Sequence, residues 1–184
     1  MKKMFFVLVL SILLVFVVGT SAFATMMLKA GMDLAGTNTL KALGVSLEND
    51  TNIGISISGE YLTEMGDNLK IGGGIEYQMK RKNEGAQKGF NYIPIYGVAQ
   101  YYVSDNTYIL GKIGYNVYSI EDANKYENVK VTGGLYCGFG GGFFLSDNMV
   151  LEASYSFHNG KIDEGGLECE SEYSKLGISV GFVF

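Results

Sequence analysis

The last stretch of the chain, residues 174–184 (SKLGISVGFVF), alternates between large apolar residues and mostly small or polar ones. The apolar residues on one face are Leu176, Ile178, Val180, Phe182 and Phe184. A period of two indicates a β-strand with two different faces. A strand this apolar aggregates through its edges unless both edges are paired. Pairing it with the first strand of the chain closes a barrel and removes the free edge.

The same alternation recurs along the chain and predicts eight strands. They fall near residues 26–34, 53–61, 69–80, 90–103, 107–118, 131–145, 149–159 and 174–184. The connections alternate between long and short, and Asp-Asn pairs mark three short ones at 67–68, 105–106 and 147–148. Long loops on one rim and tight turns on the other are typical of outer-membrane barrels. The predicted fold is therefore an all-β, eight-stranded antiparallel up-and-down transmembrane β-barrel. Pro94, the only proline, predicts a bulge in the fourth strand.

The first 24 residues predict a secretory signal peptide. Lys2 and Lys3 precede an apolar run at 4–18, and Ala22-Phe23-Ala24 forms a small-x-small cleavage site. A transmembrane helix would need roughly 20 apolar residues, which is more than this run supplies. Cleavage leaves residues 25–184, or 184 − 24 = 160 residues, enough for one barrel domain. Loss of two lysines takes the net charge from −5 to −7, which argues against a nucleic-acid partner.

Alternation alone leaves open whether the apolar face meets lipid or lines the cavity of a soluble, lipocalin-like barrel. Glycines concentrate on the polar face, including Gly72, Gly74, Gly138, Gly140 and Gly142, and on a wet surface they would only weaken the strands. Inside an eight-stranded barrel, where space is short, they make room for longer side chains. We therefore expect the polar face inside and the apolar face against lipid, with Tyr and Phe forming the interfacial girdle.

The polar face predicts a lumen closed by paired charges. Its charged residues are Lys29, Asp33, Glu60, Lys70, Glu76, Lys112, Glu152 and Lys175. Four acids and four bases can neutralise one another, whereas an unpaired buried charge is very unfavourable. The glycines also leave volume, so a small pore or ligand conduit is the alternative hypothesis.

His158 is the only histidine, and it shares a strand face with Ser156 and Glu152. Ser, His and a carboxylate are the groups that a lipid-acting hydrolase requires. However, this face points into the lumen, so we expect a structural histidine. No catalytic, cofactor or metal site is expected.

The long loops differ in charge. Residues 160–173 are acidic and could bind divalent cations, although the spacing of a calcium loop is missing. Residues 81–89 carry Arg81, Lys82 and Lys88 and could contact anionic lipid head groups.

Cys137 falls within a strand and Cys169 in a loop, so we expect no disulfide between them.

Several segments carry a resemblance to a known family. They are the N-terminal 24 residues, residues 89–96 leading to Tyr101-Tyr102, the Gly-aromatic strand 131–145, and the end 181–184. They resemble small outer-membrane barrels of the OmpX and OmpA-transmembrane-domain type, within the outer membrane protein β-barrel domain family.

The resemblance implies residence in the bacterial outer membrane, next to lipid and lipopolysaccharide. It also implies insertion by the barrel-assembly machinery, which would read Phe182 and Phe184 on the last strand. Family roles include adhesion, envelope integrity and host interaction. We therefore expect a non-enzymatic, monomeric barrel with a structural role or a surface-interaction role through its long loops.

Overall fold

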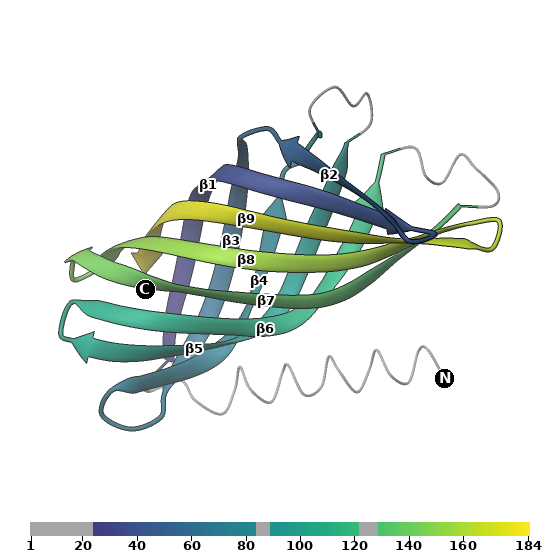
Figure 1. Ribbon diagram of the computed structural model, residues 1–184. Helices are drawn as coiled ribbons and strands as arrows, with labels where there is room; N and C mark the ends of the chain where they lie inside the picture. The colour runs from purple at the N-terminus through teal and green to yellow at the C-terminus, as the bar shows by residue number, and fades with distance from the viewer. Residues whose placement is uncertain (1–23, 84–88, 122–128) are drawn as a thin grey trace.

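The computed structural model describes residues 24–83, 89–121 and 129–184, and the predicted signal peptide lies almost wholly outside them. These residues form a single antiparallel sheet. Its strands are β1 (Ala24–Ala42), β2 (Val45–Thr51), β3 (Gly54–Glu64), β4 (Leu69–Gln78), β5 (Phe90–Ser104), β6 (Thr107–Ile120), β7 (Val129–Ser146), β8 (Met149–Glu164) and β9 (Leu167–Val183). Because β9 pairs with β1, the sheet closes into the barrel of Figure 1. The all-β barrel prediction is confirmed.

The strand count is nine rather than eight because the predicted loop at 35–51 was wrong. β1 continues to Ala42, turns at Leu43–Gly44, and returns as β2. β2 pairs with residues 36–42 of β1, and β3 pairs with residues 24–33 on the same side. The ring therefore has eight strand positions. β2 and β3 lie end to end in one of them, next to successive parts of β1. The polar composition of 35–51 hid this hairpin, since an exposed strand carries little hydrophobic period.

Two other predictions at the strand level also need correction. Residues 160–173 form a β8–β9 hairpin with a turn at Gly165–Gly166, rather than a loop. Pro94 causes no bulge, because it pairs in regular register with Asn116 of β6. β4 pairs only with residues 95–101 of β5, so the missing N–H of Pro94 costs no ladder bond on that side.

The two faces of the sheet point as predicted. Ile113 is 65% exposed on the outside, whereas the adjacent Lys112 is 7% exposed in the interior. Apolar side chains cover the outer surface of every strand position in the ring, and polar side chains fill much of the inside. None of the described residues belongs to a helix that is long and apolar enough to span a membrane.

The Asp-Asn turns tie neighbouring hairpins together at one rim. The carbonyl oxygens of Asn68, Asn106 and Asn148 accept backbone hydrogen bonds of 2.8, 2.8 and 3.0 Å from the next hairpin along. At the same rim, Phe184 donates to Met26 O at 2.9 Å and accepts from Met26 N at 3.2 Å. The last residue of the chain therefore completes the closure.

Candidate functional site

The middle of the barrel holds a square of four buried charges from four strands. Lys29 of β1 contacts Glu60 of β3 at 2.7 Å and Glu152 of β8 at 2.9 Å. Lys112 of β6 contacts the same two carboxylates at 3.1 and 3.0 Å. All four residues are buried, so we call them the central tetrad. Each ammonium group lies between two carboxylates, and the tetrad carries no net charge.

Two tyrosine hydroxyls add hydrogen bonds to the central tetrad, although Glu60 Oε2 is buried without a partner. Tyr96 donates to Glu60 at 2.8 Å, and Tyr108 donates to Glu152 at 3.0 Å. Buried ion pairs are stable only where the geometry is good and additional hydrogen bonds satisfy the remaining lone pairs. The tyrosines supply such bonds and also fill the lumen around the charges.

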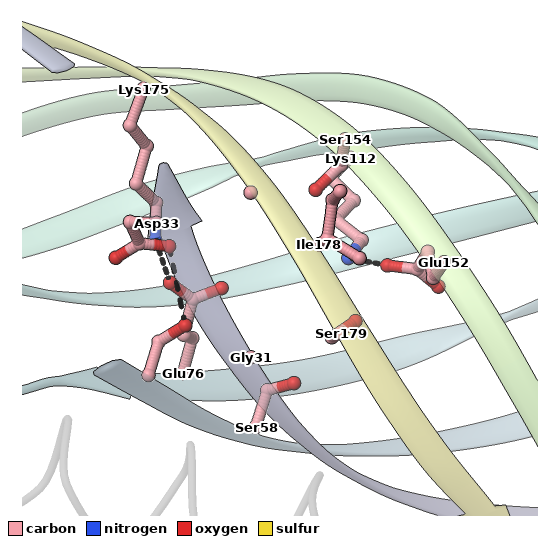
Figure 2. A pocket seen from close by; sticks show the side chains of 12 residues that line it. Gly31, Asp33, Ser58, Glu76, Lys112, Glu152, Ser154, Lys175, Ile178 and Ser179 are labelled. Atoms are coloured by element: carbon pink, nitrogen blue, oxygen red, sulfur yellow. Dashed lines mark hydrogen bonds and ion pairs between the residues drawn. The ribbon is translucent and has the colours of Figure 1, made fainter. Parts of the chain in front are cut away.

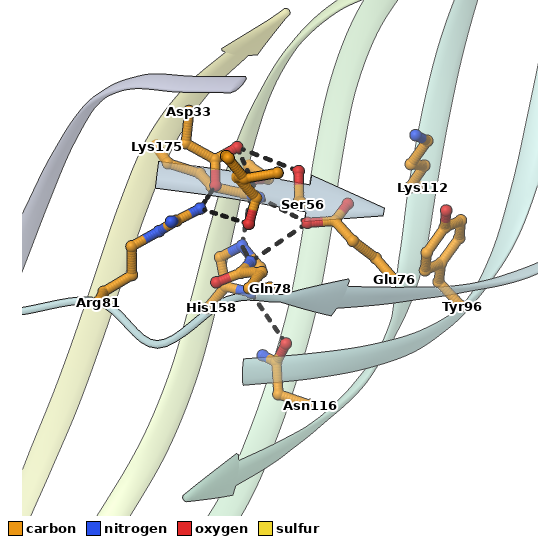
Figure 3. A network of polar contacts seen from close by, with 12 residues as sticks. Asp33, Ser56, Glu76, Gln78, Arg81, Tyr96, Lys112, Asn116, His158 and Lys175 are labelled. Atoms are coloured by element: carbon orange, nitrogen blue, oxygen red, sulfur yellow. Dashed lines mark hydrogen bonds and ion pairs between the residues drawn. The ribbon is translucent and has the colours of Figure 1, made fainter. Parts of the chain in front are cut away.

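A second charged group lies nearer the long hairpins, and Figure 3 shows its side chains. Lys175 of β9 contacts Asp33 at 3.0 Å and Glu76 at 2.5 Å. Arg81 forms an ion pair with Asp33 from the other side. Two acids and two bases again cancel, and we call these four residues the upper cluster.

Arg81 corrects the sequence interpretation, which placed it in a loop facing lipid head groups. It is buried, and it follows β4 in the stretch where the chain leaves the ladder. A Cβ on Gly54 would overlap the Arg81 guanidinium, so this glycine provides the space that the guanidinium occupies. No local pattern could have revealed this, because Gly54 and Arg81 come from different segments.

Lys70 is the one member of the predicted lumen set that lies apart from both groups. Its partner is Glu64 at 3.7 Å, and it also donates to the Thr25 hydroxyl at 3.3 Å. Its ammonium lies 5.4 Å from the centre of the Tyr102 ring. Lys70 therefore belongs to the rim of short turns, where its side chain is partly exposed.

A small cavity separates the central tetrad from the upper cluster on the side of β1, β8 and β9. Figure 2 shows it between Lys175 and Asp33 on one side and Lys112 and Glu152 on the other. Its volume is about 20 Å³, and serine hydroxyls contribute to its wall. A volume of this size holds about one water molecule.

His158 lies within a hydrogen-bonded chain that includes Ser156 but not Glu152. Its Nδ1 lies 3.0 Å from Asn116 Oδ1, and its Nε2 lies 3.1 Å from the Ser156 hydroxyl and 3.2 Å from Gln78 Nε2. Glu152 instead belongs to the central tetrad. With Nδ1 as donor and Nε2 as acceptor, both ring nitrogens of a neutral imidazole are satisfied. Alternation predicts that Asn116 and Gln78 point inward, but their contacts with His158 depend on the register between strands.

Above His158, aromatic rings form a third layer of the lumen. Tyr92 stacks on Tyr118 with ring centroids 4.4 Å apart, and Phe90 meets Tyr173 edge-on at 5.3 Å. The alternation in strand 90–103 is too poor to assign its faces, and the structure directs Phe90, Tyr92 and Tyr96 inward.

Neighbouring side chains fill much of the space that the lumen glycines provide. A Cβ on Gly74 would clash with the ring of Tyr96, on Gly142 with Tyr108, and on Gly160 with Tyr118. The glycines therefore accommodate tyrosine rings and charged side chains, and their presence does not imply an open channel.

The hairpins beyond the lumen carry exposed ion pairs. Lys41 contacts Glu172 at 2.7 Å, and Lys161 lies 3.5 Å from Glu170. Within residues 24–83, 89–121 and 129–184, no group of three or more His, Cys, Asp or Glu side chains is placed to hold a metal ion. Cys137 and Cys169 are both free thiols.

Comparison with known proteins places this architecture among outer-membrane barrels. Residues 10–184 match the family model described as outer membrane protein beta-barrel domain. The attachment invasion locus protein Ail of Yersinia pestis is 16% identical, with a TM-score of 0.52 over 88% of this chain and 99% of Ail. Neisserial surface protein A is 16% identical, with a TM-score of 0.51 over 85% and 96% of the two chains.

A third solved structure, the outer membrane protein OprG from Pseudomonas aeruginosa, is 12% identical. Its TM-score is 0.50 over 89% of this chain and 96% of OprG. No curated protein matches the sequence.

Proposed function

The chain belongs to the outer membrane protein β-barrel domain family and resides in the bacterial outer membrane, and from this premise we propose a non-enzymatic structural and surface-interaction role. In this proposal the barrel anchors its long hairpins at the cell surface, where they contribute to adhesion, host interaction or envelope integrity. The lumen is closed by paired charges and carries no solute.

The observation that carries the proposal is the central tetrad. Two lysines and two glutamates, all buried, block the middle of the barrel with four contacts of 2.7–3.1 Å. The upper cluster and the aromatic layer add two further barriers. A porin-like conduit would require all three layers to part, so we do not favour the small-pore alternative.

The burial of His158 and Ser156 supports the absence of enzymatic activity. His158 has no exposed surface, and Ser156 is also buried. A lipid acyl group would need to reach the Ser156 hydroxyl from outside the barrel, whereas the hydroxyl points into the packed lumen. A lipid-acting hydrolase at this position therefore lacks access for its substrate.

The hairpins β1–β2 and β8–β9 support a surface role. Both project from the end of the barrel opposite the C-terminus in Figure 1. A structure of Ail has been solved in complex with the heparin analogue sucrose octasulfate. In this chain the hairpin lysines Lys41 and Lys161 are engaged by glutamates, so we expect a ligand chemistry other than a polyanion.

The remaining expectations are part of the same proposal. Residues 1–24 are a signal peptide, and the mature protein is a monomer in contact with lipopolysaccharide. Phe182 and Phe184 point outward on and just after the closing strand, where the assembly machinery would reach them. An N-terminus at Thr25, measured by mass spectrometry of the outer-membrane form, tests the cleavage site.

Planar-bilayer recording tests the closed lumen. Purified full-length protein that shows heat-modifiable gel migration is expected to give no steady current. A steady, ion-selective conductance would reject the closed lumen and favour the conduit. The surface role is tested separately, by comparing adhesion of intact cells with and without the protein to host-cell monolayers.

A further inference from the structure

Lys70 is a charged residue that neither the central tetrad nor the upper cluster uses. Among the described residues, its ammonium donates one hydrogen bond, to the Thr25 hydroxyl at 3.3 Å. Glu64 lies 3.7 Å away, beyond hydrogen-bonding distance, and the Glu64 side chain is 53% exposed. A lysine ammonium has three N–H donors. Within the described part of the chain, Lys70 therefore has donors left for a further acceptor.

The three Asp-Asn turns show why a lysine at position 70 is unusual. The residues two positions after the three asparagines are Lys70, Tyr108 and Val150. Tyr108 and Val150 are fully buried in the apolar part of the interior. Lys70, by contrast, keeps part of its side chain exposed. The first turn therefore places a charged group where the other two place buried core residues.

A hollow of about 470 Å³ opens beside Lys70. Its wall is formed by the β3–β4 and β5–β6 connections and includes Asp67, Tyr102 and Asp105. Both connections lie at the end of the barrel that holds the C-terminus (Figure 1). Ligand pockets usually have volumes of about 300–1,000 Å³, so this hollow has room for a small molecule. The short turns of outer-membrane barrels face the periplasm, so its ligand would come from that side.

A buried hydrogen-bond donor lies next to Lys70. Gln100 is the partner of Lys70 in the β4–β5 ladder, so the two side chains lie on the same face of the sheet. Gln100 is fully buried, and its Nε2 has no hydrogen-bond partner among the described residues. A buried donor without a partner is costly. An anionic group bound by Lys70 would give this donor an acceptor.

The acidic residues of the hollow require a positive group as well. Asp67 and Asp105 are exposed, and neither forms an ion pair with a described residue. Together with Glu64, they place three carboxylates around the single ammonium of Lys70. A simple cation would be repelled by Lys70, and a simple anion would be repelled by the carboxylates. A ligand that carries both charges can satisfy both sets of groups.

We propose that the hollow binds a small zwitterion with one anionic group and one primary ammonium. Lys70 and Gln100 donate hydrogen bonds to the anionic group. The carboxylates of Asp67 and Asp105 accept hydrogen bonds from the ammonium, which makes these bonds charge-assisted. The phosphoethanolamine head group of a surrounding phospholipid and a free amino acid share this chemistry. The hollow lies at the opposite end of the barrel from the long hairpins, so the proposal is independent of the surface role.

Calorimetric titration of the purified, detergent-solubilised protein tests the proposal. The probes are glycerophosphoethanolamine and glycerophosphocholine, which carry the same charges but differ in the N–H donors of the cationic group. We expect about tenfold tighter binding of glycerophosphoethanolamine, because a quaternary ammonium cannot donate to the carboxylates. The detergent is dodecyl maltoside, which has no charged group to compete.

Three variants locate the binding. Lys70→Gln removes the positive charge and should weaken the binding of glycerophosphoethanolamine about tenfold or more. Asp105→Asn should reduce the preference for glycerophosphoethanolamine over glycerophosphocholine. Asp147→Asn is the matched control, since Asp147 occupies the same position in the third Asp-Asn turn but does not line the hollow, and it should bind like the unaltered protein. Heat-modifiable migration verifies that each variant is folded.

Two further measurements distinguish the sources of the ligand. The protein is placed in nanodiscs that contain equal amounts of phosphatidylethanolamine and phosphatidylcholine, and mass spectrometry identifies the lipid that it retains. Retained phosphatidylethanolamine that is lost in Lys70→Gln would assign the hollow to a lipid head group. Binding of alanine that depends equally on Lys70, without retained lipid, would assign it to a free amino acid.

Several results would overturn the proposal. Equal affinity for the two glycerophosphodiesters would show that the carboxylates do not recognise a primary ammonium. Unchanged binding in Lys70→Gln would remove the anion site, and equal losses in Asp105→Asn and Asp147→Asn would place the effect outside the hollow. Tighter binding of putrescine than of glycerophosphoethanolamine would mean simple attraction of cations to an acidic rim.

Discussion

Glu152, like Glu60, faces both lysines of the central tetrad, so the interior charge balance depends directly on it. Its contacts span 123 residues to Lys29 and 40 residues to Lys112. The same acidic side chain on the outside, such as Glu172, exchanges its ion pair with water at little cost. Burial inside the barrel therefore determines how much a salt bridge contributes to the free energy of unfolding.

Glu152→Gln should lower the free energy of unfolding by about 3–5 kcal/mol, since it leaves two buried ammonium groups to share the single carboxylate of Glu60. Urea unfolding in lipid vesicles, followed by tyrosine fluorescence, measures the change. Glu172→Gln removes the exposed pair with Lys41 and should cost at most about 1 kcal/mol. Equal losses for the two variants would show that the central tetrad contributes no more than a surface pair.

Gly54→Ala should destabilise the barrel, because its new Cβ would occupy the place of the Arg81 guanidinium and separate it from Asp33. We expect a loss of about 3 kcal/mol in the same unfolding assay. Gly111→Ala is the control, since its Cβ would meet nothing within 4 Å and should be neutral or slightly stabilising. A neutral Gly54→Ala would mean that Arg81 has an equally good alternative position.

At the scale of elements, the β1–β2 hairpin differs from the rest of the sheet in being paired on only one side of β2. Its turn is strained at Leu43, and its outer strand has no core face. The β8–β9 hairpin, by contrast, turns at two glycines with φ values of 62° and 93°, which suit the positive-φ turn. The two projecting hairpins therefore differ in local stability.

Leu43→Asn should stabilise the β1–β2 hairpin by about 1 kcal/mol, because asparagine tolerates the left-handed conformation far better than leucine. Hydrogen exchange of the β1–β2 ladder amides should slow by about fivefold, which is the corresponding change in the opening equilibrium. Leu47→Asn in β2, where the backbone is extended, should give no such protection. Faster exchange in Leu43→Asn would show that the leucine side chain contributes packing that its exposure does not reveal.

At the scale of the whole molecule, closure joins the two ends of the sequence. β1 and β9 pair along nearly their full lengths, from Met27–Val183 to Lys41–Glu170. Every described strand except β2 pairs with a neighbour on both sides over at least part of its length. Closure pairs backbone groups that would otherwise lie unpaired in lipid, where they are too costly. The apolar outer surface and the neutralised polar interior suit the same environment.

Phe184→Ala should reduce the amount of heat-modifiable barrel in the outer membrane several-fold, if the assembly machinery reads the terminal aromatic residue. Phe139→Ala is the matched control, since Phe139 is also an exposed outer phenylalanine but lies in the middle of β7. Quantitative gel analysis of membrane fractions measures both. Equal yields for the two variants would remove the terminal residue from the assembly signal.

The alternation of side chains decided most of the fold before any tertiary contact was known. The strict period in 174–184 and 107–118 predicted the strands, their two faces and the closed barrel, because direction along a strand is a local property. The charge types inside followed from the same pattern. The period failed in 35–51 and 160–173, because towards the hairpin tips both faces are exposed and no burial selects for alternation.

Only the tertiary structure decided which charges meet. Lys29 and Glu60 are 31 residues apart, and their contact depends on the register between β1 and β3. Arg81 can point inward because Gly54 has no side chain in the space that the guanidinium occupies. The hydrogen-bond partners of His158 depend on the relative positions of three strands. Period-two alternation gives the side of the sheet on which a side chain lies, whereas strand register and the stagger of the ring set its height within the lumen.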